Sequence, residues 1–251
     1  MKVKFRDQKL PMLLTSLSDA TVDDTICTVR EAIYDGTDGF LLHLEKLRGD
    51  ELNREGLTRL CGHLRGRPLY TMSYRRDDGR SDEERIAEQL LALECGASMI
   101  DMMGDMYDPS PRELTRDPRA VRRQRETIER VHEMGGEVLL SSHTWVYMTT
   151  GELLEHCAEL EARGADFIKI AMSVNSEEEA LEAMRSTVVV SRALGVPFLH
   201  ICMGPHGKLH RAIGPKLGSC FALCVQRYTP AGHKDKPLLR AEKAVLENLD
   251  A

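Results

Sequence analysis

Short apolar runs alternate regularly with longer amphipathic stretches along the 251 residues of this chain. A short apolar run bounded by turn residues predicts a buried strand, whereas apolar residues spaced three and four apart predict a helix. The predicted strands are residues 11–16, 40–47, 68–74, 98–104, 137–145, 166–172, 197–204 and 219–225. The predicted helices are residues 22–34, 50–64, 82–95, 111–134, 151–163, 176–194 and 236–249. Residues 105–119 are rich in proline and arginine, and we expect a surface loop there that leads into the fourth helix.

This alternation predicts an α/β fold, a single (β/α)8 barrel domain that spans residues 1–251. Repeated strand–helix units produce a parallel sheet, and eight units in about 250 residues have the usual size of such a barrel. An open, doubly wound sheet is the alternative fold. Its dinucleotide-binding form is disfavoured, because no GxGxxG motif follows the first predicted strand.

Bulk composition narrows the kind of partner that the chain can have. The net charge of −6 argues against electrostatic binding to nucleic acid. Residues 1–5 lack the apolar region of a signal peptide, and no apolar run is long enough to cross a membrane. The seven cysteines form no CxxC pair, which favours reduced thiols. We therefore expect a cytoplasmic protein with no nucleic-acid partner and no membrane partner.

A lysine within an apolar predicted strand is the first candidate for catalysis. Lys169 lies within residues 166–172, where burial removes water from its side chain and no partner is apparent in the same strand. A buried amine in its neutral form can attack a carbonyl carbon and form a Schiff base. The alternative is a lysine at a strand end whose ammonium group reaches water.

Polar residues recur at every second position of several predicted strands. Alternate residues of a barrel strand point to the interior, which apolar side chains fill in a purely structural barrel. The pairs that we expect to point inward are His43 and Glu45, Thr71 and Ser73, Asp101 and Met103, Ser141 and His143, Lys169 and Ala171, and His200 and Cys202. So many inward polar groups indicate a ligand site.

Three motifs resemble those of the type I 3-dehydroquinate dehydratase family. The segment around His143 is similar to its S-x-H strand, and Ile168-Lys169-Ile170-Ala171 is similar to its I-K-(I/V)-A strand. Residues 203–211, which end at Arg211, resemble its S-M-G-x-x-G-x-x-S-R segment. Gly218-Ser219 matches a later G-S, and residues 230–233 resemble its A-P-G-Q loop.

The resemblance implies an activity and a role for each matching residue. Lys169 would form a Schiff base with a ketone that also carries a carboxylate, and no cofactor would be needed. His143 would act as the acid and base, and Asp77 would orient it. Arg211 would bind the substrate carboxylate, and Ser219 and His233 would also contact the substrate. The family further implies a homodimer and a place in aromatic biosynthesis or quinate breakdown.

Departures from the family pattern concern the substrate-binding residues. The family's E-x-R motif in the second strand corresponds to His43 and Glu45, and the arginine of its T-x-R motif is replaced by Ser73. We expect these three residues to contact the substrate. The predicted reaction is therefore the dehydration of 3-dehydroquinate or of a related carboxylate-bearing hydroxy-ketone.

Three other functions remain open on this evidence. A class I aldolase of this architecture would also use a lysine in the sixth strand. A metal-dependent lyase or isomerase would use His43, Glu45, His143 and His200 as ligands. A non-catalytic descendant would keep only the fold, although the presence of both Lys169 and His143 counts against it.

Overall fold

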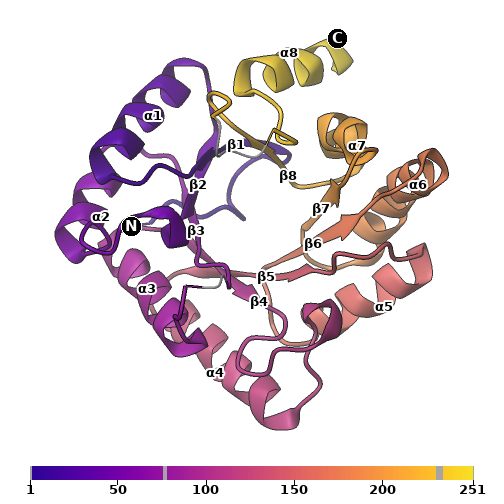
Figure 1. The fold of residues 1–251 in the computed structure, drawn as a ribbon, viewed down its shortest axis with the longest axis horizontal. Coiled ribbons are helices and arrows are strands. Elements are labelled where there is room, and N and C mark those ends of the chain that lie inside the picture. The colour runs from indigo at the N-terminus through magenta and orange to yellow at the C-terminus, as the bar shows by residue number, and fades with distance from the viewer. Residues whose placement is uncertain (1, 76–77, 230–233, 251) are drawn as a thin grey trace.

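The computed structural model describes residues 2–75, 78–229 and 234–250, and eight parallel strands form its centre (Figure 1). The hydrogen-bonded strand order is β7-β6-β5-β4-β3-β2-β1-β8. Between β7 and β8, the Cys220 amide donates a hydrogen bond to the Phe198 carbonyl oxygen at 2.8 Å, so the barrel is nearly closed. The strands are β1 Met12–Leu17, β2 Gly39–His43, β3 Leu69–Met72, β4 Met99–Met103, β5 Glu137–His143, β6 Phe167–Ser173, β7 Phe198–Met203 and β8 Phe221–Cys224.

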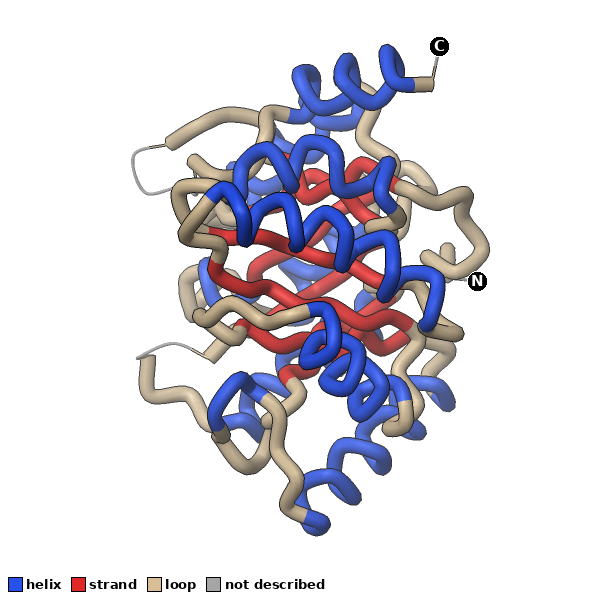
Figure 2. The backbone as a smooth tube through the Cα atoms, turned by 90° about the vertical axis from the view of Figure 1, so that its right-hand side faces the viewer, coloured by secondary structure: helices blue, strands red, loops and turns tan. Residues whose placement is uncertain are grey.

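Helices form a ring outside the strands, which Figure 2 shows from the side. They are α1 Val22–Tyr34, α2 Arg54–Cys61, α3 Asp82–Cys95, α4 Pro118–Glu133, α5 Thr150–Glu161, α6 Glu177–Ala193, α7 Gly207–Ile213 and α8 Leu239–Leu249. The short 3-10 helices are η1 Leu44–Lys46, η2 Pro111–Glu113 and η3 Gly214–Leu217. The predicted (β/α)8 barrel is confirmed, whereas α7 forms where no helix is predicted from the sequence.

The closed end of the barrel is packed with aromatic side chains. Phe5, from the segment before β1, makes edge contacts with Phe167 and Phe221, and the latter two rings stack on each other. The Phe5 amide donates a hydrogen bond to Glu137 at the start of β5. This end is the amino-terminal end of the strands, so a ligand has to enter at the opposite, carboxyl-terminal end.

Two strands present the opposite face to the barrel interior from the one predicted. Tyr70 and Met72 of β3, and Leu199 and Ile201 of β7, belong to the interior cluster. Thr71, Ser73, His200 and Cys202 therefore point toward the helices, because side chains alternate along a strand. The inward prediction is confirmed for His43, Asp101, Ser141, His143, Lys169 and Ala171, whose positions alternate with residues of the outer apolar cluster.

Among the described residues, no helix is both long enough and apolar enough to cross a membrane.

Candidate active site

A cavity of about 300 Å³ opens at the carboxyl-terminal end of the strands. Four residues that the sequence predicts for the site line this cavity, namely His43, His143, Lys169 and Arg211. Most of the remaining wall is apolar or aromatic and comes from Leu41, Met72, Tyr74, Trp145, Ala171, Ile201, Met203 and Leu223. Asp235 and Lys236, from the segment between β8 and α8, complete the lining. Apolar walls with a few convergent polar groups are typical of small-molecule sites.

Lys169 is buried at the centre of the barrel and has an acidic partner from another strand. Its Nζ lies 3.0 Å from Asp101 Oδ2 and 3.4 Å from the Tyr70 hydroxyl. Asp101 also accepts hydrogen bonds from Tyr70 and from Ser141 Oγ. Burial, reinforced by Asp101, raises the pKa of Tyr70 well above its usual value, so the phenol stays protonated and donates. Asp101 of β4 is thus the partner of Lys169 that the sequence of β6 alone does not show.

His143 is hydrogen-bonded to Glu113, a residue that the sequence does not assign to the site. Glu113 Oε2 accepts hydrogen bonds from the backbone amide of His143 at 2.7 Å and from its Nδ1 at 3.0 Å. The Tyr74 hydroxyl donates to Glu113 Oε1 at 2.5 Å. Burial acts to raise the pKa of Glu113, but its bonds to His143 and Tyr74 lower it overall. An ionised Glu113 therefore fixes the proton on Nδ1 of His143 and leaves Nε2 to exchange a proton with a substrate.

The loop that carries Glu113 has an unusual backbone. Arg112 and Glu113 have φ values of 62° and 50°, in the left-handed region that non-glycine residues seldom adopt. The Ser142 hydroxyl donates to the Glu113 carbonyl oxygen at 2.8 Å, and a Cβ at Gly104 would lie 2.6 Å from that oxygen. Such strain costs of order 1–3 kcal/mol and persists at functional sites where neighbouring groups over-determine the backbone. Apolar periodicity carries no signal for this conformation.

Arg211 reaches the cavity because the chain turns sharply after β7. Gly204 has a φ of +89°, and a Cβ at Gly207 would lie 2.6 Å from the Cys202 carbonyl oxygen, so α7 packs tightly against the strand end. Arg211 Nε donates to that same carbonyl at 3.0 Å, and its Nη2 lies 2.6 Å from Asp235 Oδ2. The guanidinium is thereby held at the cavity wall with a planar group available to a carboxylate.

His43 connects Glu45 with a second lysine that the sequence does not assign to the site. His43 Nδ1 lies 3.1 Å from Glu45 Oε1, and its Nε2 lies 3.3 Å from Lys236 Nζ. Lys236 Nζ also donates to Ser16 Oγ at 3.0 Å. Burial, with a smaller contribution from Lys236, lowers the pKa of His43 to about 4. His43 is therefore neutral near pH 7 and accepts a hydrogen bond from the Lys236 ammonium.

The remaining predicted site residues lie elsewhere. The chain leaves β2 after His43, so Glu45 sits in η1, buried behind His43, and does not line the cavity. The interpretation of Ser73 as a cavity residue is wrong, because its hydroxyl donates to Glu88 of α3 at 2.7 Å. Ser219 lies before β8, where its Oγ accepts from the His200 amide at 3.2 Å, also away from the cavity. Asp77 and His233 lie outside the described residues.

The four residues of the predicted metal site do not converge. His43 is bonded to Glu45 and His143 to Glu113, while His200 points away from the barrel interior toward α6. This correction follows from the reversed face of β7. The metal-dependent alternative therefore loses the ligand set on which it depends.

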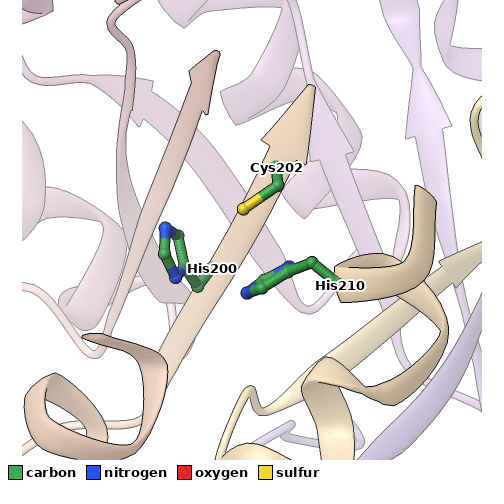
Figure 3. Close-up of side chains that lie close together, drawn as sticks. All are labelled: His200, Cys202 and His210. Carbon is green, nitrogen blue, oxygen red and sulfur yellow. The ribbon is translucent and has the colours of Figure 1, made fainter. Parts of the chain in front are cut away.

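His200 instead belongs to a buried cluster with Cys202 and His210, outside the barrel (Figure 3). One ligand atom from each of the three lies within 4.8 Å of the others. The Thr187 hydroxyl donates to the Ala183 carbonyl oxygen, so it has to accept from His200 Nδ1 and His210 Nε2, each at 2.8 Å. Those two nitrogens carry the ring protons in this arrangement, whereas His200 Nε2 and His210 Nδ1 keep their lone pairs and are buried without a hydrogen-bond partner among the described residues. We interpret the cluster as a hydrogen-bonded link between β7, α6 and α7.

Solved structures of 3-dehydroquinate dehydratases share this fold. The enzyme from Geobacillus kaustophilus superposes with a TM-score of 0.82 at 16% identity, covering 100% of this chain and 96% of the other. The Clostridium difficile enzyme, solved with covalently modified comenic acid, also gives 0.82 at 16% identity and covers 96% and 93% of the two chains. At such low identity these likenesses establish the fold alone.

Sequence comparison identifies the family. A 3-dehydroquinate dehydratase of Alkaliphilus oremlandii is 27% identical over 106 residues, which are 41% of this chain and 42% of the relative. One from Lactiplantibacillus plantarum is 27% identical over 120 residues, which are 47% and 46% of the two chains. These matches span less than half of each relative's length. The family model described as type I 3-dehydroquinase matches residues 57–231, well over half of the sequence, and the chain therefore belongs to the type I 3-dehydroquinase family.

Proposed function

We propose that this protein is a cofactor-free, Schiff-base-forming lyase that dehydrates 3-dehydroquinate or a related carboxylate-bearing hydroxy-ketone. The observation that carries the proposal is that Lys169, His143 and Arg211 line one cavity at the carboxyl-terminal end of the barrel. These residues supply an amine nucleophile, an acid and base, and a carboxylate-binding group. Family membership supports the same reaction class.

The first stage joins the substrate to Lys169. The amine has to lose a proton before it attacks, and Asp101 Oδ2, at 3.0 Å from Nζ, can accept that proton. Addition of the nitrogen to the ketone carbon, followed by loss of water, gives a protonated imine. The imine withdraws electrons from the adjacent carbon, whose C–H bond becomes acidic.

The second stage eliminates water from the bound substrate. His143 removes the proton from the adjacent carbon, and the electron pair forms an enamine. The hydroxyl group one carbon further on then leaves as water after His143 returns a proton to it, and the imine forms again, now conjugated with the new double bond. Hydrolysis of this imine frees the product and Lys169, so the net change is the loss of one water molecule.

Arg211 would orient the substrate through its carboxylate. Its planar guanidinium can bind two carboxylate oxygens, and its bonds to Cys202 and Asp235 restrict its side chain beforehand. Arg211 binds the carboxylate and thereby positions the carbon at which His143 acts as base and then as acid. This combination favours dehydration over the aldolase alternative.

We also infer a homodimer in the cytoplasm, as the family resemblance implies. Sedimentation at several protein concentrations tests the assembly directly, and a monomer at every concentration would contradict it.

Trapping with borohydride tests the central claim. Reduction of the enzyme with 3-dehydroquinate and other keto acids should give a stable mass adduct on the peptide that contains Lys169. The Lys169→Ala variant should lose both the adduct and turnover, whereas the His143→Ala variant should still trap substrate but turn over slowly. The absence of any adduct, together with activity that a chelator abolishes, would refute the Schiff-base reading.

A further inference from the structure

Lys236 is a buried cation at the cavity wall that the proposed reaction does not use. The residue is 7% exposed, and its ammonium makes two hydrogen bonds, to Ser16 Oγ at 3.0 Å and to His43 Nε2 at 3.3 Å. An ammonium group has three N–H donors. One donor is therefore left for a group that enters the cavity.

The other charged groups around the cavity are already matched. Lys169 is paired with Asp101, Arg211 with Asp235, and the His143 imidazole with Glu113. Among the described residues, no carboxylate lies within ion-pair distance of Lys236 Nζ, and the two groups that bond to it are a hydroxyl and an imidazole that is neutral near pH 7. Burial, together with the positive charges of Arg211 and Lys169, lowers the pKa of Lys236 to about 7. The charges of Asp235 and Glu45 act in the opposite direction, and an anion bound in the cavity would give the ammonium a direct anionic contact as well.

Among the described residues, most of the wall between the charged groups is apolar or aromatic. Leu41, Met72, Ile201, Met203 and Leu223 line the cavity between the polar groups. Hydroxyl groups placed against such side chains would lose hydrogen bonds to water without replacement. The pattern favours a compact ligand that has anionic ends and a largely apolar body.

We propose that Lys236, with Ser16 and His43, forms a second anion subsite, so that the preferred substrate is a hydroxy-ketone with a carboxylate at Arg211 and a second anionic group at Lys236. This inference rests on the proposed Schiff-base reaction at Lys169. The second group is a carboxylate or a phosphate, since both present anionic oxygens to an ammonium.

Three ketones that differ at one end test this subsite. The probes are 4-oxopentanoate, with one acid group, 4-oxoheptanedioate, with a second carboxylate, and 4-oxo-6-phosphonohexanoate, with a phosphonate in its place. The concentration that gives half-maximal borohydride trapping is measured by mass spectrometry for the wild-type protein and for Lys236→Met. Lys208→Met is the control, because Lys208 is an exposed cation in the same helix as Arg211.

The wild-type protein should trap each diacid at a concentration about 10-fold or more below that for 4-oxopentanoate, as a charge-assisted hydrogen bond predicts. Lys236→Met should lose this preference, so that all three ketones are trapped at similar concentrations, and Lys208→Met should retain it. Whether the dicarboxylate or the phosphonate binds more tightly then identifies the second group.

Two results would overturn the proposal while the Schiff-base reaction stands. One is equal trapping of all three ketones by the wild-type protein, which needs no variant to fold. The other is equal weakening of all three by Lys236→Met, which would mean that Lys236 shares the carboxylate of Arg211. A failure of the wild-type protein to trap any ketone would instead refute the reaction at Lys169, and the subsite with it.

Discussion

Burial of Lys236 makes the stability of the protein depend on pH, and Lys236→Met should remove that dependence. The pKa of this ammonium falls from 10.5 to about 7 on folding, chiefly through desolvation. Between these values the unfolded chain binds the proton and the folded protein does not, so stability rises with pH. Below the folded pKa both states are charged, and the full cost of burying the cation applies.

The magnitude follows from the size of the shift. Each pKa unit corresponds to about 1.4 kcal/mol, so the full cost of burying the charged side chain is about 5 kcal/mol. Raising the pH from 6 to 9 removes about half of that cost, because Lys236 loses its proton in the folded protein over this range. The wild-type protein should therefore gain about 2.5 kcal/mol of unfolding free energy relative to Lys236→Met between these two pH values.

Urea unfolding at pH 6, 7.5 and 9 measures this difference, with Lys9→Met as the control. Lys9 is exposed at the opposite end of the barrel, so its replacement should leave the pH dependence unchanged. The test is how the difference in unfolding free energy between the wild-type protein and Lys236→Met changes with pH. The effect of the methionine on packing is the same at every pH and does not contribute to this change. Parallel pH curves for the wild-type protein and Lys236→Met would show that Lys236 is hydrated in the folded state and that burial does not lower its pKa.

Three further substitutions test the site. Glu113→Gln should reduce kcat by about 100-fold, because it removes the charge that orients His143, the proposed acid and base. The variant should still be trapped by borohydride. A loss of trapping would mean that Glu113 has a purely structural role. Arg211→Lys should raise the KM of carboxylate-bearing substrates about 10-fold or more with a smaller change in kcat, because the bidentate contact is lost, and an unchanged KM would refute that role. Gly207→Ala should destabilise the protein by about 1–3 kcal/mol in urea unfolding, because its Cβ would meet the Cys202 carbonyl oxygen at 2.6 Å, whereas unchanged stability would show that α7 can shift.

The fold could be predicted because its signals are local. Apolar runs mark the strands, and capping residues set the helix starts, as in α3, where Ser81 and Glu84 form a capping box. The predicted bounds of α1 and α3 coincide with the observed ones. α7 escapes prediction because it has only seven residues and begins at a glycine.

The direction of side chains was harder to predict than the strands themselves. The prediction of inward side chains assumes that a polar residue in a strand faces the cavity. This assumption is correct for His143 and Lys169. It fails for Ser73 and His200, because the helix layer also offers polar partners, Glu88 of α3 and Thr187 of α6. A buried polar group needs a hydrogen-bond partner on whichever side it lies, so polarity alone does not identify the inner face.

Two site residues lie outside the strands and α-helices, where apolar periodicity gives no information. Glu113 reaches His143 only because the backbone at η2 adopts positive φ values, and Lys236 precedes α8 rather than beginning it. The family motifs could not indicate either residue, since neither occupies a matched motif position. Contacts between loops of different β/α units appear only once the barrel has closed.

The corner of the cavity near β2 is where the charged groups depart from the family pattern. The family motif that the second strand resembles, E-x-R, has a glutamate and an arginine. Here Glu45 is withdrawn behind His43, and Lys236 provides the positive charge from the segment after β8. Under the proposed function, a substrate hydroxyl group would lack an anionic acceptor at this corner, whereas an anionic oxygen would have Lys236 as a charged donor. The same exchange leaves the bonded partners of Lys169 and His143 in place, because Asp101 and Glu113 come from the other side of the barrel.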